Sequence, residues 1–395
     1  MKILIVGSGA VASVISKHLA KDPGVTEIIC GSKDLERAKE FIDTSCGKIK
    51  LVKLDAAEID EVAKTAKGAD LIINASLPRF NENILEAALK AHANYQDLAS
   101  ELADLKTAEQ LKFNERFQKE RLVGLINTGV APGIDNLLAK EGADKLDEVE
   151  TINIRLVEEQ QTSEFIFSWS AETALDVLTA LPLLYKNNEF VLSKPFGEVE
   201  EYEFLQPFGK RHIFTIYGDE VATLPFYIKT KNVDYKSSGT DIEFSKALYR
   251  LGLLDKTPIE LNGEKIVPLE FFKRIAPKVP TPKEMVKFVK DGVIENAFFA
   301  LVVEIIGKEN GRKIKIKNSA VFPDLKEITA KFPGATYVSY PTGTAAFVFS
   351  KAIPKIKNYG VFPPEALDED IRKDILVELE SKGIVISEQF LSASN

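Results

Sequence analysis

The sequence predicts an α/β protein in which a doubly wound parallel sheet is followed by a mixed α+β domain. The chain opens with an apolar run and a glycine turn, and apolar runs then alternate with helical patterns as far as Ile126. Alternating strand patterns begin at Val149. Apolar runs separated by helices are typical of a parallel sheet that is covered on both faces, so the change after Ile126 indicates a second domain.

The first strand and the first helix flank the turn Gly7-Ser8-Gly9-Ala10-Val11-Ala12. Residues 3–6 are an apolar run of strand length, and apolar residues recur at helical spacing after the turn. Glycine lets the backbone approach a pyrophosphate closely, and a helix N-terminus offers free N–H groups to an anion. The turn therefore predicts a Rossmann-type dinucleotide site, and a tight turn without a ligand is the alternative.

The second strand is expected to end at Cys30, and Gly31, Ser32 and Lys33 follow it. A fold that selects NAD places Asp or Glu near this point to hold the ribose hydroxyl. A hydroxyl and an ammonium group instead suit a 2′-phosphate, to which Arg37 can add positive charge. The sequence thus favours NADP(H), while NAD(H) stays possible because Ser32 as a helix cap beside a solvated Lys33 fits either cofactor.

Further strands and helices continue the alternation. We expect strands at 49–54, 71–74, 94–97 and 122–126, and helices at 58–66, 84–91 and 101–120. In a doubly wound fold, ligands bind outside the carboxyl ends of the strands. The residues at these ends include Asp55, Asn74, Asp97, Leu98 and the segment 127–135, so six loops are expected to meet at one crevice.

The second half of the chain is predicted to be a mixed domain. We expect strands at 149–157, 213–217, 299–306 and 313–317, and helices at 172–185, 283–289, 344–351 and 368–382. The residues 277–282 contain three prolines and are expected to form a linker. We predict a dinucleotide-binding domain at 1–135, a substrate and dimerisation domain at 136–340, and a C-terminal segment at 341–395 that packs back on the first domain.

Composition excludes several classes of protein. The 395 residues are 45% hydrophobic and 28% charged, which are globular proportions. The net charge of -8 and the lack of a basic block argue against a nucleic-acid partner, and no run of about twenty apolar residues predicts a membrane span. Cys30, Cys46 and three scattered histidines predict neither a disulfide nor a metal site. A soluble cytoplasmic protein is expected.

The segment 127–139, Asn-Thr-Gly-Val-Ala-Pro-Gly-Ile-Asp-Asn-Leu-Leu-Ala, resembles a signature of the saccharopine dehydrogenase-like family. Three further stretches agree with that family in order along the chain: Cys30-Gly31-Ser32, Phe167-Ser168-Trp169-Ser170 and 359–365. The resemblance implies an NAD(P)-dependent oxidoreductase that acts on a carbon–nitrogen bond of an amino acid or a polyamine, and it suggests a homodimer. A non-catalytic dinucleotide-binding or redox-sensing protein is the alternative.

The same resemblance, together with the glycine turn, assigns a set of cofactor-binding residues. They are Gly7, Ser8, Gly9, Ala10, Val11, Gly31, Ser32, Lys33, Asp55, Asn74, Asp97, Leu98, Gly129, Val130, Ala131 and Ser170.

Two departures from the saccharopine reductases bear on the substrate. Ala131 stands where those enzymes have Asp, as it does in the lysine 6-dehydrogenases of the family, and Ala171-Glu172 stand where they have Arg. An arginine suits a dicarboxylate, whereas Glu172 favours a cationic amine. The alternative for Glu172 is an ordinary acid in the first turn of a helix that Ser170 caps.

Four residues are candidates for catalysis. Asp97 can exchange a proton with the reacting amine or water, or it can cap a loop; Trp169 can wall the nicotinamide pocket, or it can belong to the core. Glu172 can attract an amine, and His212 can act as an acid or base or lie solvated at a strand end. Candidate clamps for a substrate carboxylate, with a surface charge as the alternative for each, are Arg79, Arg155 and Arg211.

Overall fold

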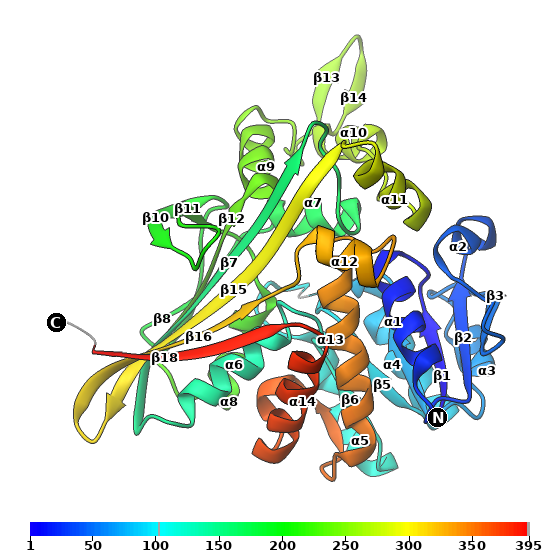
Figure 1. Cartoon of the computed structure of the whole chain (residues 1–395), viewed down its shortest axis with the longest axis horizontal. Coiled ribbons are helices and arrows are strands. Elements are labelled where there is room, and N and C mark those ends of the chain that lie inside the picture. The colour runs from blue at the N-terminus through cyan, green and yellow to red at the C-terminus, as the bar shows by residue number, and fades with distance from the viewer. Residues whose placement is uncertain (102, 393–395) are drawn as a thin grey trace.

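The computed structural model describes residues 1–101 and 103–392, which form two large sheets and a short hairpin (Figure 1). The first sheet is parallel throughout. Its strands in spatial order are β17 (Gly360–Phe362), β6 (Val123–Leu125), β5 (Asn94–Gln96), β4 (Leu71–Asn74), β1 (Lys2–Val6), β2 (Glu27–Ser32) and β3 (Ile49–Lys53). The strand order reverses beside β1, as it does in a doubly wound sheet, so the predicted fold of this part is confirmed.

Helices cover both faces of the first sheet. One layer contains α1 (Ala10–Lys21), α13 (Ser339–Ala352) and α14 (Glu369–Ser381), and the other contains α3 (Ile59–Thr65), α4 (Asn81–Ala91) and α5 (Asn114–Glu120). The short helix α2 (Leu35–Phe41) follows β2. Because both faces are covered, the central strands β1 and β4 are buried on both sides and consist mainly of apolar residues.

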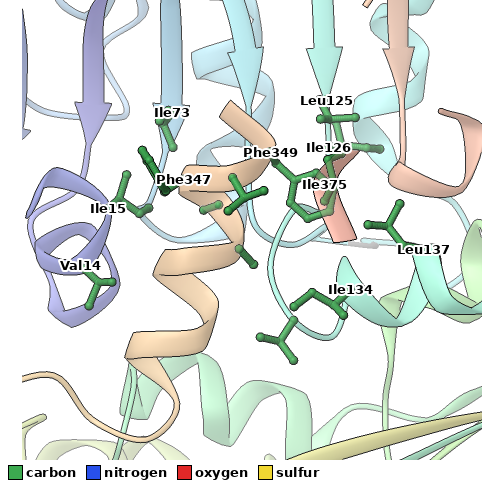
Figure 2. Close-up of a cluster of buried hydrophobic side chains, with 14 of the residues drawn as sticks. Val14, Ile15, Ile73, Leu125, Ile126, Ile134, Leu137, Phe347, Phe349 and Ile375 are labelled. Atoms are coloured by element: carbon green, nitrogen blue, oxygen red, sulfur yellow. The ribbon is translucent and has the colours of Figure 1, made fainter. Parts of the chain in front are cut away.

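Helix α13 is the centre of one core layer (Figure 2). Its Phe347 and Phe349 lie between Val14 and Ile15 of α1 and the helix α6 (Ile134–Ala143). A side chain at Gly343 would overlap with Val14, so the glycine lets α1 and α13 approach closely. The small and apolar sequence of α13 therefore fixes the helix that carries the glycine turn.

The second sheet is mixed and crosses the molecule beside the first (Figure 1). Its strands in order are β10 (Gly197–Glu203), β11 (Lys210–Thr215), β12 (Asn232–Gly239), β7 (Glu148–Thr162), β15 (Ile294–Glu309), β16 (Arg312–Val321) and β18 (Val385–Ser392), with β8 (Leu183–Lys186) and β9 (Glu189–Leu192) beside β12. Strands β7 and β12 are parallel, and the other pairs are antiparallel. The predicted strands overlap β7, β11, β15 and β16, whereas β12 and β18 were not predicted.

The remaining helices surround the second sheet, and the hairpin stands apart from it at the top of Figure 1. They are α7 (Ala171–Thr179), α8 (Leu224–Tyr227), α9 (Thr240–Arg250), α10 (Pro268–Ile275), α11 (Pro282–Lys290) and α12 (Leu325–Lys331), and the hairpin strands are β13 (Ile259–Leu261) and β14 (Glu264–Ile266). No helix in the described part of the chain is long and apolar enough to cross a membrane.

Residues 341–395 were predicted to return to the first domain. Helix α13 packs on α1 and β17 joins the first sheet, but β18 pairs with β16 of the second sheet. The three-part division stays a prediction, and the structure adds that its last part supplies a strand to each sheet.

The predicted helix over 101–120 is wrong in its first half. Residue 102 lies outside the described residues, a 3-10 helix spans Glu109–Phe113, and only 114–120 are α-helical. Asp104 accepts hydrogen bonds from the backbone N–H groups of Lys106 and Thr107. Such a local turn competes with a helix for the same N–H groups.

The predicted helix over 172–185 is too long. Helix α7 ends at Thr179, and residues 183–186 form β8. The proline at position 182 disfavours the α conformation in the residue before it, which ends the helix although the apolar pattern continues.

Candidate functional site

A cavity of about 590 Å³ lies between the carboxyl ends of the first sheet and one face of the second sheet. We call its two sides the first wall and the second wall. The first wall is made by the lining residues 6–9, 11, 31–33, 54–56, 74–81, 98–99 and 129–132. The second wall is made by the lining residues Leu156, Glu158, Phe165, Phe167, Trp169, Ser170, Thr173, Ala174, Val177, Leu178, Ile216, Tyr217, Gly218, Asp219, Glu220, Tyr235, Ser237, Asp241, Ile242, Ser245 and Phe299.

The glycine turn has the geometry that a pyrophosphate needs. Gly7 has φ +113°, and a side chain there would overlap with the carbonyl group of Ala75. Its N–H donates to the carbonyl of Gly31 over 2.9 Å, which ties the turn to β2. Gly9 caps α1 without a side-chain hydrogen bond, and a Cβ atom there would meet nothing within 4 Å. Open space thus faces the free N–H groups of a helix N-terminus, and a dinucleotide phosphate fits it.

The end of β2 carries polar groups but no acid. The hydroxyl of Ser8 donates to that of Ser32 over 2.8 Å, and Nζ of Lys33 lies 2.7 Å from Oδ2 of Asp55. The Lys33 side chain is 78% exposed. The hydrogen bond to Asp55 raises the pKa of Lys33, so the ammonium group is retained at the cavity edge. Arg37 instead donates to the carbonyl of Val279 and does not line the cavity.

The turn 129–133 supplies the deep end of the first wall. Gly133 has φ +138°, and a side chain there would overlap with Gly129. The N–H of Gly133 donates to Oδ1 of Asp135 and Oδ1 of Asn136, each over 2.9 Å. Asp135 is fully buried, and burial raises its pKa. These contacts hold the backbone of 129–132 against the cavity, as a site for a flat nicotinamide ring requires.

Asp97 lies behind the first wall. Its carboxylate is 1% exposed and accepts hydrogen bonds from Tyr95 Oη (2.9 Å), Gln110 Nε2 (3.0 Å) and the backbone N–H of Asn127 (2.7 Å). Burial raises the pKa of Asp97 to about 7, against the effect of these donors. Asp97 therefore fixes the loops after β5 and β6, and the structure does not bring its carboxylate to the cavity.

Trp169 and Ser170 face the cavity from the start of α7. Ser170 caps that helix by accepting a hydrogen bond from the N–H of Thr173 (3.3 Å). Glu172, in the first turn, lies 2.6 Å from Nη1 of Arg79, and both side chains are about half exposed. Glu172 therefore pairs with Arg79 of the first wall and does not itself line the cavity, a placement that agrees with the alternative of an acid in the first turn of a capped helix; its role toward a substrate amine stays a prediction.

Fifteen predicted site residues line the cavity together. They are Gly7, Ser8, Gly9, Val11, Gly31, Ser32, Lys33, Asp55, Asn74, Leu98, Gly129, Val130, Ala131, Trp169 and Ser170. Ala10, Asp97, Glu172 and His212 are not among the lining residues. His212 is exposed on β11, opposite Glu201 of β10, because the strand places it on the outer part of the sheet.

The other candidate clamps also lie apart from the cavity. Arg155 is 3% exposed and lies 2.6 Å from Asp234, and Arg211 is directed toward Glu159. Arg79 alone of the three lines the cavity. Burial raises the pKa of the Cys30 thiol to about 12, so that side chain is inert packing.

The prediction missed the acids of the second wall. They are Glu158, Asp219, Glu220 and Asp241. Burial raises the pKa of each of the four carboxyl groups. One signal was available in the sequence, because Glu158 directly follows the alternating strand predicted at 149–157.

The doubly wound domain carries a glycine turn that faces a cavity between the two sheets. This arrangement is typical of a dinucleotide-dependent oxidoreductase. Two family models match the chain: the saccharopine dehydrogenase NADP binding domain over residues 3–124, and the saccharopine dehydrogenase C-terminal domain over residues 129–384. The chain therefore belongs to the saccharopine dehydrogenase family, as its motifs predicted. It is an NAD(P)-dependent oxidoreductase that acts on a carbon–nitrogen bond.

Relatives of similar length support this membership. The chain is 24% identical to the carboxynorspermidine synthase of Vibrio alginolyticus, over 94% of this chain and 93% of the relative. It is 22% identical to the carboxyaminopropylagmatine dehydrogenase of Synechocystis, over 93% of each chain. Among solved structures, the L-Glu-forming saccharopine dehydrogenase of Saccharomyces cerevisiae matches with a TM-score of 0.72 and 16% identity, over 99% of both chains. At 16% identity this match supports only the fold, and the fold belongs to the predicted α/β class.

Proposed function

We propose that the protein is an NADP(H)-linked dehydrogenase or reductase whose substrate is a cationic amine, either an amino acid or a polyamine. One observation carries this proposal. The glycine turn, the turn 129–132 and Trp169 line the same cavity, and the second wall of that cavity contains four carboxyl groups. When bound, the nicotinamide supplies or accepts the hydride at the carbon of the C–N bond.

The first wall offers a place for each part of the cofactor. The turn Gly7–Val11 would bind the pyrophosphate at the N-terminus of α1, and the turn 129–131 would lie against the nicotinamide. Ser32 and Lys33 would bind a 2′-phosphate, for which Lys33 would leave Asp55. These groups support NADP(H), because a 2′-phosphate brings a negative charge to an exposed ammonium group.

The substrate is proposed from the second wall and from the relatives. Within the described residues, no lysine or arginine lines the second wall, whereas four carboxyl groups do. A substrate rich in carboxylates would meet repulsion there, and an ammonium group would meet attraction. Two relatives carry names of polyamine-related enzymes, carboxynorspermidine synthase and carboxyaminopropylagmatine dehydrogenase, which agrees with a cationic substrate. Trp169 would exclude water from the reacting bond.

Titration and turnover test the proposal. We expect the purified protein to bind NADPH more tightly than NADH, and to turn over with at least one of lysine, saccharopine and carboxynorspermidine. Binding of both nucleotides without turnover of any of these amines would instead support a non-catalytic or redox-sensing protein. A homodimer and a cytoplasmic location stay predictions, which chromatography with light scattering and cell fractionation would test.

A further inference from the structure

Two acids of the second wall interact with each other, and in the described part of the chain neither forms an ion pair with a basic side chain. Glu158 is on β7, in register with Gly239 of β12 and Phe299 of β15. Asp241 is in the first turn of α9, directly after the end of β12. The negative charge of Asp241 adds to burial in raising the pKa of Glu158. Glu158 and Asp241 both line the cavity, and the backbone of Gly239 packs directly against that of Glu158, where a side chain would not fit.

The two carboxylates differ in how the protein holds them. Asp241 accepts hydrogen bonds from Gln160 Nε2 (2.6 Å) and Tyr337 Oη (3.3 Å), so its position is fixed. For Glu158, burial and Asp241 are the influences that act on the carboxyl group. Two neighbouring acids in a partly apolar cavity repel each other, and that repulsion disappears when a cation lies between them.

Further polar groups without partners extend along the same wall. In the described part of the chain, the hydroxyl groups of Ser237 and Tyr217 have no hydrogen-bond partner, although these residues are only 1% and 6% exposed. Both line the cavity. Buried hydroxyl groups are normally hydrogen-bonded, so these two indicate a ligand with polar groups.

The sheet register sets the spacing of these groups. Ser237 pairs with Leu156, and Gly239 pairs with Glu158, so Ser237 lies two residues along the strands from the acid. Two residues of a strand span about 7 Å. Asp219 also lines this wall, and its Oδ2 accepts a hydrogen bond from the backbone N–H of Ser100 (2.7 Å). The wall thus contains hydrogen-bond acceptors as well as apolar side chains.

We infer that Glu158 and Asp241 bind a protonated aliphatic nitrogen of the substrate other than the nitrogen that reacts. The substrate would therefore carry at least two nitrogens joined by methylene groups, as a diamine or polyamine does. A protonated amine offers only donors, which suits carboxylates and free hydroxyl oxygens, and its methylene groups suit Leu156 and Phe299. The inference rests on the proposed function, because it names the substrate class of the same cavity.

A metal ion is a poor alternative occupant. Within residues 1–101 and 103–392, no group of three or more His, Cys, Asp or Glu side chains is arranged to hold a metal. An organic ammonium group needs fewer ligands and tolerates the aromatic side chains Phe165 and Phe299, which line the same region.

Calorimetry of two matched amines tests the inference. The protein is saturated with whichever reduced nucleotide binds more tightly, so that no amine is oxidised, and it is titrated with 1,5-diaminopentane and with n-pentylamine. We expect the diamine to bind at least about tenfold more tightly, since a charged hydrogen-bonded contact contributes on that order. Glu158→Gln and Asp241→Asn should each reduce the ratio to about threefold or less.

Glu159→Gln is the matched control. Glu159 is the next residue of β7, it does not line the cavity, and it accepts a hydrogen bond from Thr240 (3.2 Å). This variant removes the same charge from the same strand, so it should keep the tenfold ratio. A ratio near one in the unmodified protein, or an unchanged ratio in both cavity variants with nucleotide affinity intact, would overturn the inference.

The outcome separates this inference from the proposed function. Turnover with a lost diamine preference in the variants supports both. Turnover with no diamine preference overturns the ammonium site and leaves the oxidoreductase, whereas a strong diamine preference without turnover of any amine overturns the proposed function and leaves the site.

Discussion

The two walls of the cavity are built in different ways. The first wall consists of turns at the ends of parallel strands, and its shape depends on backbone conformation at Gly7 and Gly133. The second wall consists of side chains on the face of a mixed sheet, and its character depends on aromatic rings and carboxyl groups. The difference indicates that backbone groups mainly recognise the cofactor, and many members of a fold can share such groups. Side chains recognise the substrate, and side chains can differ between members of the same fold.

The largest effect is expected from a substitution in the glycine turn of the first wall. Gly7→Ala places a side chain against Ala75 at φ +113°, which costs about 1–3 kcal/mol of stability in strain alone. We expect NADPH affinity to fall about 100-fold or more, because the turn must move away from the phosphate. Urea unfolding and nucleotide titration measure both effects.

Gly9→Ala is the control for that change. Gly9 has φ -83°, and a Cβ atom there would meet nothing within 4 Å. The free energy of unfolding should change by less than about 1 kcal/mol. A similar loss of stability in both variants would show that the close contact between Gly7 and Ala75 does not determine the conformation of the glycine turn.

The next effect compares the pH dependence of the α1–α13 contact, which lies behind the first wall, with that of the second wall. His18 of α1 is stacked on Phe347 of α13 and lies 3.0 Å from Thr344. Burial lowers its pKa to about 4, so the folded protein binds fewer protons than the unfolded chain between pH 6.5 and pH 4. Stability from this contact is present above pH 6.5 and is lost as the pH falls through that window. The acids of the second wall have raised pKa values and act in the opposite direction, since their contribution falls as the pH rises above their ordinary range.

His18→Gln isolates the first of these contributions. The unmodified protein should lose roughly 3 kcal/mol more stability than the variant between pH 7 and pH 4. Urea unfolding at a series of pH values measures the difference. Parallel curves for the two proteins would contradict the assignment of that pH dependence to His18.

A smaller effect sharpens the assignment of the cofactor. Lys33→Asp should weaken NADPH binding by about 10- to 100-fold, because a charge-assisted contact is replaced by repulsion. NADH binding should change by less than about threefold. Lys39→Asp, on α2 outside the cavity, is the matched control. Equal effects of Lys33→Asp on both nucleotides would show that Lys33 does not meet the phosphate.

The smallest effect concerns the ion pair that joins the two walls. Arg79 and Glu172 are about half exposed, and such pairs contribute about 1 kcal/mol or less. Glu172→Gln should therefore change the free energy of unfolding little and leave KM for the amine within about twofold. A large rise in KM would instead support Glu172 as a group that attracts the substrate.

The sequence predicted the first wall well and the second wall poorly, and the reason is physical. The turn at Gly7, the polar end of β2 and the segment 127–139 are local signals, in which a few adjacent residues fix backbone and chemistry together. Glu158 and Asp241 become neighbours only because β7 pairs in parallel with β12, about eighty residues later in the chain. No short pattern encodes that pairing.

The same difference explains why the sequence left two interpretations open for some candidate residues. Asp97 follows a strand end as expected, but Tyr95, Gln110 and Asn127 surround it, and two of these donors come from other segments of the chain. His212 directly precedes the strand predicted at 213–217, and in the structure it lies on β11, where pairing with β10 sets its face of the sheet. Position along a strand was predictable, whereas exposure depended on pairing.

The late strands β17 and β18 have a consequence for biosynthesis. The ribosome makes β6 and β16 well before their partners, which complete the first sheet at 360–362 and the second at 385–392. Until then each nascent sheet has an unpaired edge that can capture other strands. We therefore expect chaperone engagement during synthesis to last until residues 360–392 have emerged, and both sheets to close almost at the same moment.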